Sequence, residues 1–399
     1  MSDIFELYGT CLCMSILVFF LSCMFCITPP CQTVVYRTPA SIRGLLDPPG
    51  PTMDTLLRSR ASPNARLIRA FHISNSFVSP DPTVHANFLI KSRSLLRAAK
   101  RNWTRFNGTA LQAVELSLPD HTIPFDVFVR SVTLRTTIVG LLDPDVDITS
   151  LSSNDVHIVT NLITDIWILS KKPAEIPEHL LEMLNYHLRC LIPDQAAYPN
   201  PLDFVIPIWE TLWRVVAATL AYVHTNAVAR RAFLDLNDHP DEDQFCAPKL
   251  HRTSPSAENY ISESLRLRPP VRHITRHQFR PSLLTKFLPP FLASRIPPHI
   301  DIHIADIESA QRSVFWESDS SPPEAFDAAR FLREPKASDV LAFGAGPLKC
   351  AAVKWAPMAA AVIVGAILNH VDDVTYYIVR GERVGDRTGW DGWLVRKLA

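Results

Sequence analysis

The sequence predicts a mainly α-helical fold with small β-sheets. Helical patterns of apolar residues recur along the chain, and each is bounded by Pro, Asp or Asn, residue types that begin or end helices. The 33 prolines and only 12 glycines suit helices that are joined by stiff linkers. Two short runs, residues 271–276 and 374–383, look like strands. A chain of 399 residues is long enough for one large domain or two small ones.

The N-terminus predicts a membrane anchor. Residues 7–27 carry no charge, and a helix of about 20 apolar residues spans a bilayer. Asp3 and Glu6 stand where a cleaved signal peptide would have basic residues. Arginines gather after the apolar run instead, so the positive-inside rule leaves the body of the protein cytosolic. We expect residues 1–30 to form a single-pass anchor with a lumenal N-terminus.

The segment after the anchor is rich in proline. Pro48-Pro49-Gly50-Pro51 is stiff and cannot extend a helix, so it resembles a hinge at the membrane. Only one short helical piece, residues 52–71, follows before the main pattern begins. We therefore divide the chain into the anchor, a hinge and shortened N-terminal region at 31–66, and a main domain at 67–399.

The main domain contains a series of predicted helices. They cover residues 84–99, 125–142, 154–170, 178–190, 200–224 and 227–236. The helix at 200–224 is long and apolar, which is typical of a central core helix, and it carries Glu210 and Thr211.

The next helix carries a Glu-x-x-Arg pair. Ser254 as the N-cap and Pro255 as the first helical residue mark its start. Glu263 and Arg266 share one face of this helix because they are three residues apart. Taken alone, such a pair is more often a solvated surface ion pair.

A loop near the C-terminus contains two glycines and places a single cysteine just before an apolar segment. It reads Phe343-Gly-Ala-Gly-Pro-Leu-Lys-Cys350-Ala-Ala, and its glycines allow close approach to a flat ligand. Residues 351–369 predict a helix, which would place Cys350 at a helix N-terminus where a thiol pKa is depressed. On its own, a cysteine in an apolar segment is more often an inert core residue.

Three motifs in this order resemble those of the cytochrome P-450 superfamily. They are Glu263-x-x-Arg266, the segment from Pro323 to Phe331 with Ala328 in place of a second proline, and the loop ending at Cys350. The resemblance is to microsomal, fungal-type members with a shortened N-terminal region, and it implies the P-450 fold with an N-terminal transmembrane helix.

The resemblance implies a role for each matching residue. Cys350 would be the axial ligand of the iron of haem b, and Phe343 and Gly346 of the same loop would also bind the haem, which makes residues 67–399 a haem-thiolate catalytic domain. Arg276 would bind a haem propionate, since a carboxylate at a pocket edge needs a cationic partner. Arg330 would join Glu263 and Arg266 in a buried structural network.

Glu210 and Thr211 take the place of the family's acid–alcohol pair. A hydroxyl backed by a carboxylate can position water and deliver the protons that cleavage of an O–O bond requires. Pro207 and Ile208 replace the small residues that usually precede this pair, so the oxygen groove would be shaped differently.

The implied function is a monooxygenase that inserts one oxygen atom from O2 into an apolar organic substrate, in secondary metabolism of terpenoid or polyketide type. Its partners would be an NADPH-dependent P-450 reductase and lipid of the endoplasmic reticulum membrane. The formal net charge of zero does not indicate a nucleic-acid partner. Two alternatives stay open, namely a P-450-fold enzyme of rearrangement, desaturation or coupling, and an inactive membrane-anchored relative.

Overall fold

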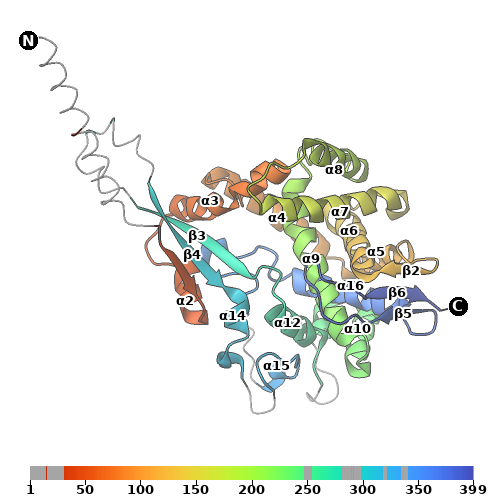
Figure 1. Ribbon diagram of the computed structural model, residues 1–399. Coiled ribbons are helices and arrows are strands. Elements are labelled where there is room, and N and C mark those ends of the chain that lie inside the picture. Colours follow the sequence, from red (N-terminus) through yellow and green to blue (C-terminus); the bar gives the residue numbers. More distant parts are fainter. Residues whose placement is uncertain are drawn as a thin grey trace, which may run out of the picture.

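The computed structural model describes residues 31–246, 254–280, 298–317, 321–333 and 340–398, and the single positions 15, 289 and 291. Within them the protein is mainly helical with two small sheets, which confirms the predicted fold class. In Figure 1 one sheet lies at one side of the helices, and the other lies near the C-terminus. The predicted anchor at 1–30 lies outside the described residues, position 15 excepted.

Helices make up most of the described chain. Those in the first half are α2 (Pro39–Leu46), α3 (Met53–Phe71), α4 (Pro82–Lys100), α5 (Trp103–Glu115), α6 (Phe125–Thr137), α7 (Ser153–Ser170) and α8 (Glu178–Leu191). Those in the second half are α9 (Leu202–Val223), α10 (Ala227–Asp238), α11 (Glu242–Cys246), α12 (Ala257–Leu267), α14 (Ile307–Gln311), α15 (Arg330–Arg333) and α16 (Ala356–His370). Four short turns of other helix types are η1 (Ile138–Leu142), η2 (Ile148–Ser150), η4 (Val314–Trp316) and η6 (Gly346–Leu348). Helix α3 crosses the boundary that we predict between residues 66 and 67.

Two three-stranded sheets flank the helices. The first has the order β1-β4-β3, in which β1 (Thr33–Tyr36) runs parallel to β4 (His299–Asp306), and β3 (His273–Arg280) runs antiparallel to β4. The second has the antiparallel order β2-β6-β5, made of β2 (Thr122–Pro124), β6 (Leu394–Lys397) and β5 (Tyr376–Val379). Strand β1 was not predicted, and it adds a strand from the region at 31–66 to the first sheet.

Helix α9 is the central core helix. It packs against α6, α12 and α16, and nearly all of its side chains are buried. Among the residues described, it alone is long and apolar enough to cross a membrane, but most of it is buried inside the protein. Pro207, Ile208 and Thr211 are only half-buried. Their spacing places them on one face of the helix, which the protein leaves partly uncovered.

Two helices begin later than the sequence predicts. The N-cap of α12 is Ser256 rather than Ser254, because Ser256 and Asn259 form a reciprocal capping box. Helix α16 begins at Ala356 rather than at residue 351, with Pro357 at the second position, where proline is favoured. Cys350 therefore precedes a turn and not a helix N-terminus.

Candidate functional site

The loop that carries Cys350 is closed by hydrogen bonds between its own backbone groups. The Cys350 N–H donates to the Phe343 carbonyl at 3.0 Å, and the Gly344 N–H donates to the Leu341 carbonyl at 2.8 Å. Gly344 and Gly346 have φ angles of +70° and +69°, in the region that favours glycine. The glycine spacing noted in the sequence therefore sets the shape of this loop.

Gly346 also lets the loop touch helix α2. A Cβ atom at this position would lie 2.6 Å from the carbonyl oxygen of Leu46 and 2.8 Å from the Cβ of Asp47. Real Cβ atoms do not come so close to backbone, so only glycine fits. The contact fixes the cysteine loop against α2 and the first sheet.

The Cys350 side chain is exposed, yet burial by the surrounding protein raises the pKa of its thiol. A hydrogen bond from the Ala352 N–H and the charge of Lys349 oppose this rise. The expectation of a thiol pKa depressed by a helix N-terminus is therefore wrong, because α16 starts six residues later and burial dominates.

Strand β3 brings Arg276 to the side of the cysteine loop. The side chain of Ile274 lies 3.6 Å from where a Cβ of Gly344 would be. Alternate residues of a strand share a face, so Arg276 lies on the same face as Ile274. The Arg276 guanidinium donates only to the neighbouring Thr275 carbonyl among the described residues. Burial lowers its pKa to about 10.

Arg60 of α3 is the second member of this cluster, and we call Arg60 and Arg276 the open arginine pair. Burial and the charge of Arg276 lower the pKa of Arg60 to about 10. Arg60 donates to the carbonyl and hydroxyl oxygens of Ser76 at 2.5 and 2.6 Å, while its buried Nε has no partner. Neither arginine forms an ion pair with a carboxylate among the described residues.

The sequence analysis did not identify Arg60. The signal that could have found it is an arginine on the apolar face of an amphipathic helix, between Leu57 and Leu67, all three being buried in α3. The helix is attached to β3 by a 2.8 Å hydrogen bond between Ser62 and His277.

His85 extends the cluster through Ser76. The Ser76 hydroxyl lies 2.6 Å from the His85 Nδ1. Burial, followed by the charges of Arg60 and Arg93, lowers the His85 pKa. A buried imidazole beside two guanidiniums stays neutral near pH 7, so His85 adds a hydrogen-bonding group and no further charge.

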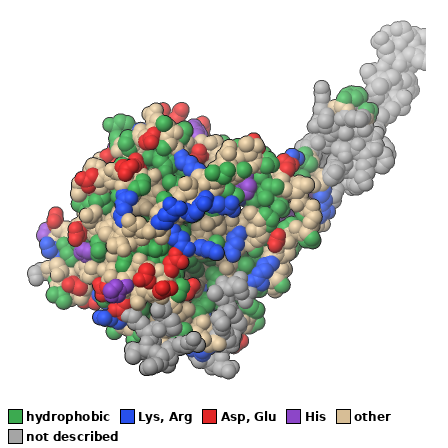
Figure 2. All heavy atoms as spheres, turned by 180° about the vertical axis from the view of Figure 1, so that it is seen from behind, with side chains coloured by type: hydrophobic (Ala, Val, Ile, Leu, Met, Phe, Trp, Pro, Cys, Tyr) green, Lys and Arg blue, Asp and Glu red, His purple; other side chains and the backbone are tan. Residues whose placement is uncertain are grey.

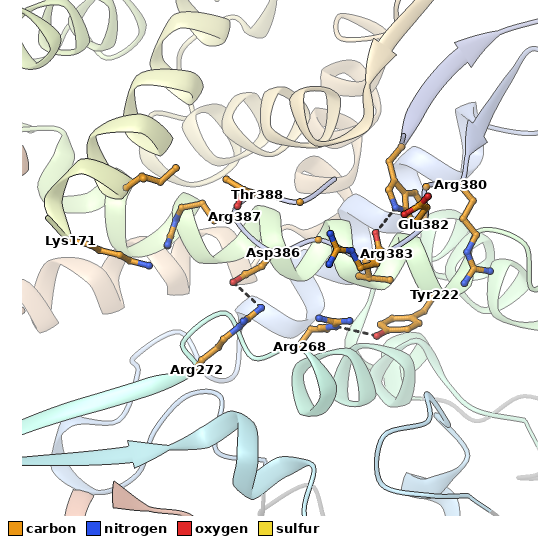
Figure 3. A pocket seen from close by; sticks show the side chains of 16 residues that line it. Lys171, Tyr222, Arg268, Arg272, Arg380, Glu382, Arg383, Asp386, Arg387 and Thr388 are labelled. Atoms are coloured by element: carbon orange, nitrogen blue, oxygen red, sulfur yellow. Dashed lines mark hydrogen bonds and ion pairs between the residues drawn. The ribbon is translucent and has the colours of Figure 1, made fainter. Parts of the chain in front are cut away.

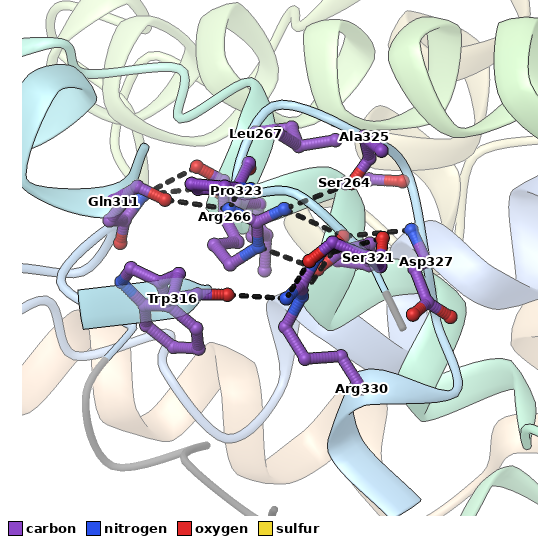
Figure 4. A network of polar contacts seen from close by, with 12 residues as sticks. Ser264, Arg266, Leu267, Gln311, Trp316, Ser321, Pro323, Ala325, Asp327 and Arg330 are labelled. Carbon is purple, nitrogen blue, oxygen red and sulfur yellow. Dashed lines mark hydrogen bonds and ion pairs between the residues drawn. The ribbon is translucent and has the colours of Figure 1, made fainter. Parts of the chain in front are cut away.

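The structure brings Glu263, Arg266 and Arg330 together in a buried network, which we call the closed network (Figure 4). Arg266 binds both oxygens of Glu263 at 2.7 Å, and both side chains are fully buried. Arg266 also donates to the carbonyls of Gln311 and Pro323 at 2.7 and 2.6 Å.

Arg330 joins the closed network from α15. It lies 3.7 Å from Glu263 and donates to the carbonyls of Trp316 and Pro322. Glu263 accepts a further hydrogen bond at 2.9 Å from the N–H of Asp327. The network thus ties helix α12 to the segment that leads to the cysteine loop.

The structure does not bring the Glu210 carboxylate to the Thr211 hydroxyl. Glu210 is buried and binds Arg214 at 2.8 Å and Arg387 at 2.5 Å. The Thr211 hydroxyl lies 3.3 Å from the carbonyls of Pro207 and Ile208 on the uncovered face of α9. Adjacent residues of a helix point about 100° apart, which explains the separation.

Solved structures that resemble this one are cytochrome P450 enzymes. CYP175A1 from Thermus thermophilus matches with a TM-score of 0.58 and 16% identity, over 92% of this chain and 89% of that one. A 6-coordinated cytochrome P450, also from Thermus thermophilus, matches with a TM-score of 0.60 and 17% identity, over 91% of each chain. The chain has a cytochrome P450 fold. The haem domain of cytochrome P450DA gives a TM-score of 0.62 at 14% identity, over 92% of this chain and 87% of that one.

The sequence comparisons give a different result. No family model and no curated protein matches the chain. The likeness therefore concerns the fold, and the function has to be argued from the site.

Proposed function

We propose that this protein is a haem-thiolate oxidoreductase in which Cys350 is the axial ligand of the iron of haem b. The single observation that carries the proposal is the open arginine pair beside the cysteine loop. Arg60 is buried and Arg276 is half-buried, the two guanidiniums repel each other, and neither has a carboxylate partner among the described residues, so the pair favours an anion. The two propionates of a haem supply two carboxylates, which arginine binds well.

The cysteine loop fits the same cofactor. Cys350 is exposed, and Phe343, whose carbonyl closes the loop, is half-buried. A thiolate-bound haem supplies activation of molecular oxygen. Gly346 holds the loop on α2, and the Phe343 carbonyl fixes the backbone of Cys350. Arg276 and Arg60 bind the propionates, assisted by His85, while the closed network of Glu263, Arg266 and Arg330 supports the loop.

The reaction that fits the inferred site is insertion of one oxygen atom from O2 into an organic substrate. Thr211 lies on the uncovered face of α9 and has a hydroxyl that can hold a proton-carrying water. Glu210 is one residue away and would supply the carboxylate of the relay.

One observation favours a second candidate, which is a rearrangement, desaturation or coupling reaction. Glu210 is held by two arginines and makes no hydrogen bond to Thr211. A proton relay would need its carboxylate to be available to water near the hydroxyl, whereas these reactions make no such demand on Glu210.

Replacement of Thr211 distinguishes the two candidates. With an NADPH-dependent reductase and a substrate that turns over, Thr211→Ala should raise the NADPH consumed per product at least about tenfold if the hydroxyl delivers protons. The control is Thr219→Ala, because Thr219 is a fully buried threonine of the same helix. Equal coupling in all three proteins would favour the second candidate.

We also propose a reductase as electron donor and an attachment to the endoplasmic reticulum membrane. Lys and Arg side chains gather on the face shown in Figure 2, and such a surface favours an acidic partner protein. The uncharged run at residues 7–27 would supply the anchor. The proposal of an apolar substrate from terpenoid or polyketide metabolism rests on the resemblance alone.

Alkaline extraction of membranes from cells that make the full chain tests the attachment. A single-pass protein stays in the pellet, whereas release into the supernatant would contradict the anchor. Removal of residues 1–30 should move the protein to the supernatant, since the remaining described chain has only the buried helix α9 of spanning length.

A further inference from the structure

A cavity with cationic walls is lined by residues to which we have assigned no contact with haem. It is open to solvent, has a volume of about 700 Å³, and is shown in Figure 3. Six basic side chains line it, and they are Lys171, Arg268, Arg272, Arg380, Arg383 and Arg387. Only two acidic side chains, Glu382 and Asp386, line it with them. None of the residues that we assign to haem lines this cavity.

Some of these cations already have partners within the protein. Arg387 binds Glu210, and Arg272 binds Asp386 at 3.1 Å. Arg268 donates to the hydroxyl of Tyr222 at 3.3 Å, which leaves its charge uncompensated.

Three cations of the cavity, besides Arg268, have no ion pair among the described residues. Lys171, Arg380 and Arg383 form no salt bridge within 4.0 Å, although Glu382 lies between the two arginines in the sequence. The local potential is positive, since burial, Arg387 and Arg66 together lower the pKa of Lys171. A pocket with spare positive charge attracts anions and concentrates them.

The loop that forms one wall of the cavity has a defined shape. The indole N–H groups of Trp390 and Trp393 donate to the carbonyls of Asp386 and Arg383 at 2.8 and 2.7 Å. A Cβ at Gly385 would lie 2.7 Å from the ring of Trp390, and a Cβ at Gly381 would lie 2.3 Å from that of Trp393. The glycines therefore allow the loop to pack on the two rings, which fixes the backbone that carries the arginines.

The cavity also has an apolar part. Ile168, Val384 and the ring of Trp393 contribute to its lining, so it offers surface for an aliphatic or aromatic body as well as for a charged group.

We propose that this cavity binds a small organic anion, with a carboxylate or phosphate group held by Arg380 and Arg383 and an apolar body against Val384 and Trp393. Lys171, on the opposite side of the cavity (Figure 3), adds to its positive potential. The inference does not depend on the proposed haem chemistry, because binding can be measured without turnover.

Calorimetric titration of the purified full chain tests this proposal with three probes. Phenyl phosphate carries both the anion and the ring, inorganic phosphate lacks the ring, and phenol lacks the anion. We expect phenyl phosphate to bind at least about tenfold more tightly than either of the others, and its affinity to fall as salt is added.

Charge-removing variants connect the binding to this cavity. Arg383→Gln and Arg380→Gln should each weaken phenyl phosphate binding about tenfold, and Arg383→Lys should restore part of it. Arg396→Gln is the matched control, because Arg396 is also an exposed arginine near the C-terminus but does not line the cavity. It should change the dissociation constant less than about twofold. Both cavity arginines are exposed, so thermal melting of the variants should match that of the unaltered chain.

Three results would overturn the proposal. They are no saturable binding of phenyl phosphate in the millimolar range, binding of phenol that is equally tight, and losses in the cavity variants no greater than in Arg396→Gln.

Discussion

The closed network and the open arginine pair both withdraw arginine side chains from solvent, Arg276 only in part, but they differ in the partners that the protein provides. Arg266 and Arg330 meet the Glu263 carboxylate and several backbone carbonyls. Arg60 and Arg276 meet hydroxyl and carbonyl oxygens and one another's charge, with no carboxylate among the described residues. Burying a charged side chain without a counter-charge is unfavourable. The comparison indicates that the first group serves the fold, whereas the second group is arranged for a ligand.

The largest expected effect comes from breaking the closed network. Arg266→Leu leaves the fully buried Glu263 carboxylate without its main partner, so the free energy of unfolding should fall by about 3–5 kcal/mol. Denaturant unfolding measures the change. Arg58→Gln is the control, because its ion pair with Asp54 is exposed and should contribute less than about 0.5 kcal/mol. Similar losses in both variants would show that the network is not structural.

The second effect concerns the cysteine loop. Gly346→Ala places a Cβ against the Leu46 carbonyl at a positive φ angle, so the free energy of unfolding should fall by at least about 2 kcal/mol. Gly44→Ala, in helix α2, meets no atom within 4 Å and should instead stabilise the protein by about 0.5–1 kcal/mol. If both substitutions had the same sign, the loop would not be seated on α2 as described.

The third prediction separates ligand binding from stability. Arg276→Gln removes a half-buried charge that has no ion pair among the described residues, so the haem-free chain should keep its stability or gain up to about 1 kcal/mol. Its haem dissociation constant should nevertheless rise about tenfold, because a propionate loses its charged partner. Haem titration and denaturant unfolding are the two measurements.

Arg280→Gln is the control for haem binding. Arg280 lies on the same strand and pairs with Asp301 at 2.6 Å, so the haem dissociation constant should not change. A loss of stability in Arg276→Gln without a loss of haem affinity would place Arg276 with the structural arginines.

The smallest expected effect is a dependence of stability on pH. Burial and the charges of Arg60 and Arg93 lower the His85 pKa in the folded chain, so below about pH 6.5 the unfolded chain binds a proton that the folded chain does not. The free energy of unfolding therefore decreases as the pH falls below 6.5, by at most about 1.4 kcal/mol per pH unit for this group. In His85→Gln the contribution of this group to the slope of unfolding free energy against pH should vanish. An unchanged slope would show that His85 does not titrate in contact with the arginines.

The sequence predicted most of the fold. The predicted helices have regular apolar patterns, and the structure confirms them with small shifts at their ends, whereas α5 (Trp103–Glu115) was not predicted. The predicted start of α12 was two residues too early because Ser254 and Ser256 are both suitable N-caps. Only the reciprocal hydrogen bonds with Asn259 select Ser256. The start of α16 was displaced because residues 351–355 contain good helix formers but are folded as a turn.

The site could be predicted only in part. Cys350, Glu263, Arg266 and Arg330 belong to motifs with fixed spacing, so they could be read from the sequence. Arg60 could not, because it lies 216 positions before Arg276 and the two meet only through the packing of α3 on β3. The separation of Glu210 from Thr211 depends on Arg387, which is far away in the sequence.

The reduced carbon monoxide spectrum of the purified protein tests the central claim, thiolate ligation by Cys350, most directly. We predict the long-wavelength Soret band of thiolate-ligated haem in the unaltered chain. Cys350→Ser should lose this band. Cys190→Ser, which changes another exposed cysteine, should retain it. A spectrum without this band in the unaltered, haem-supplied chain, or one that persists in Cys350→Ser, would contradict the account.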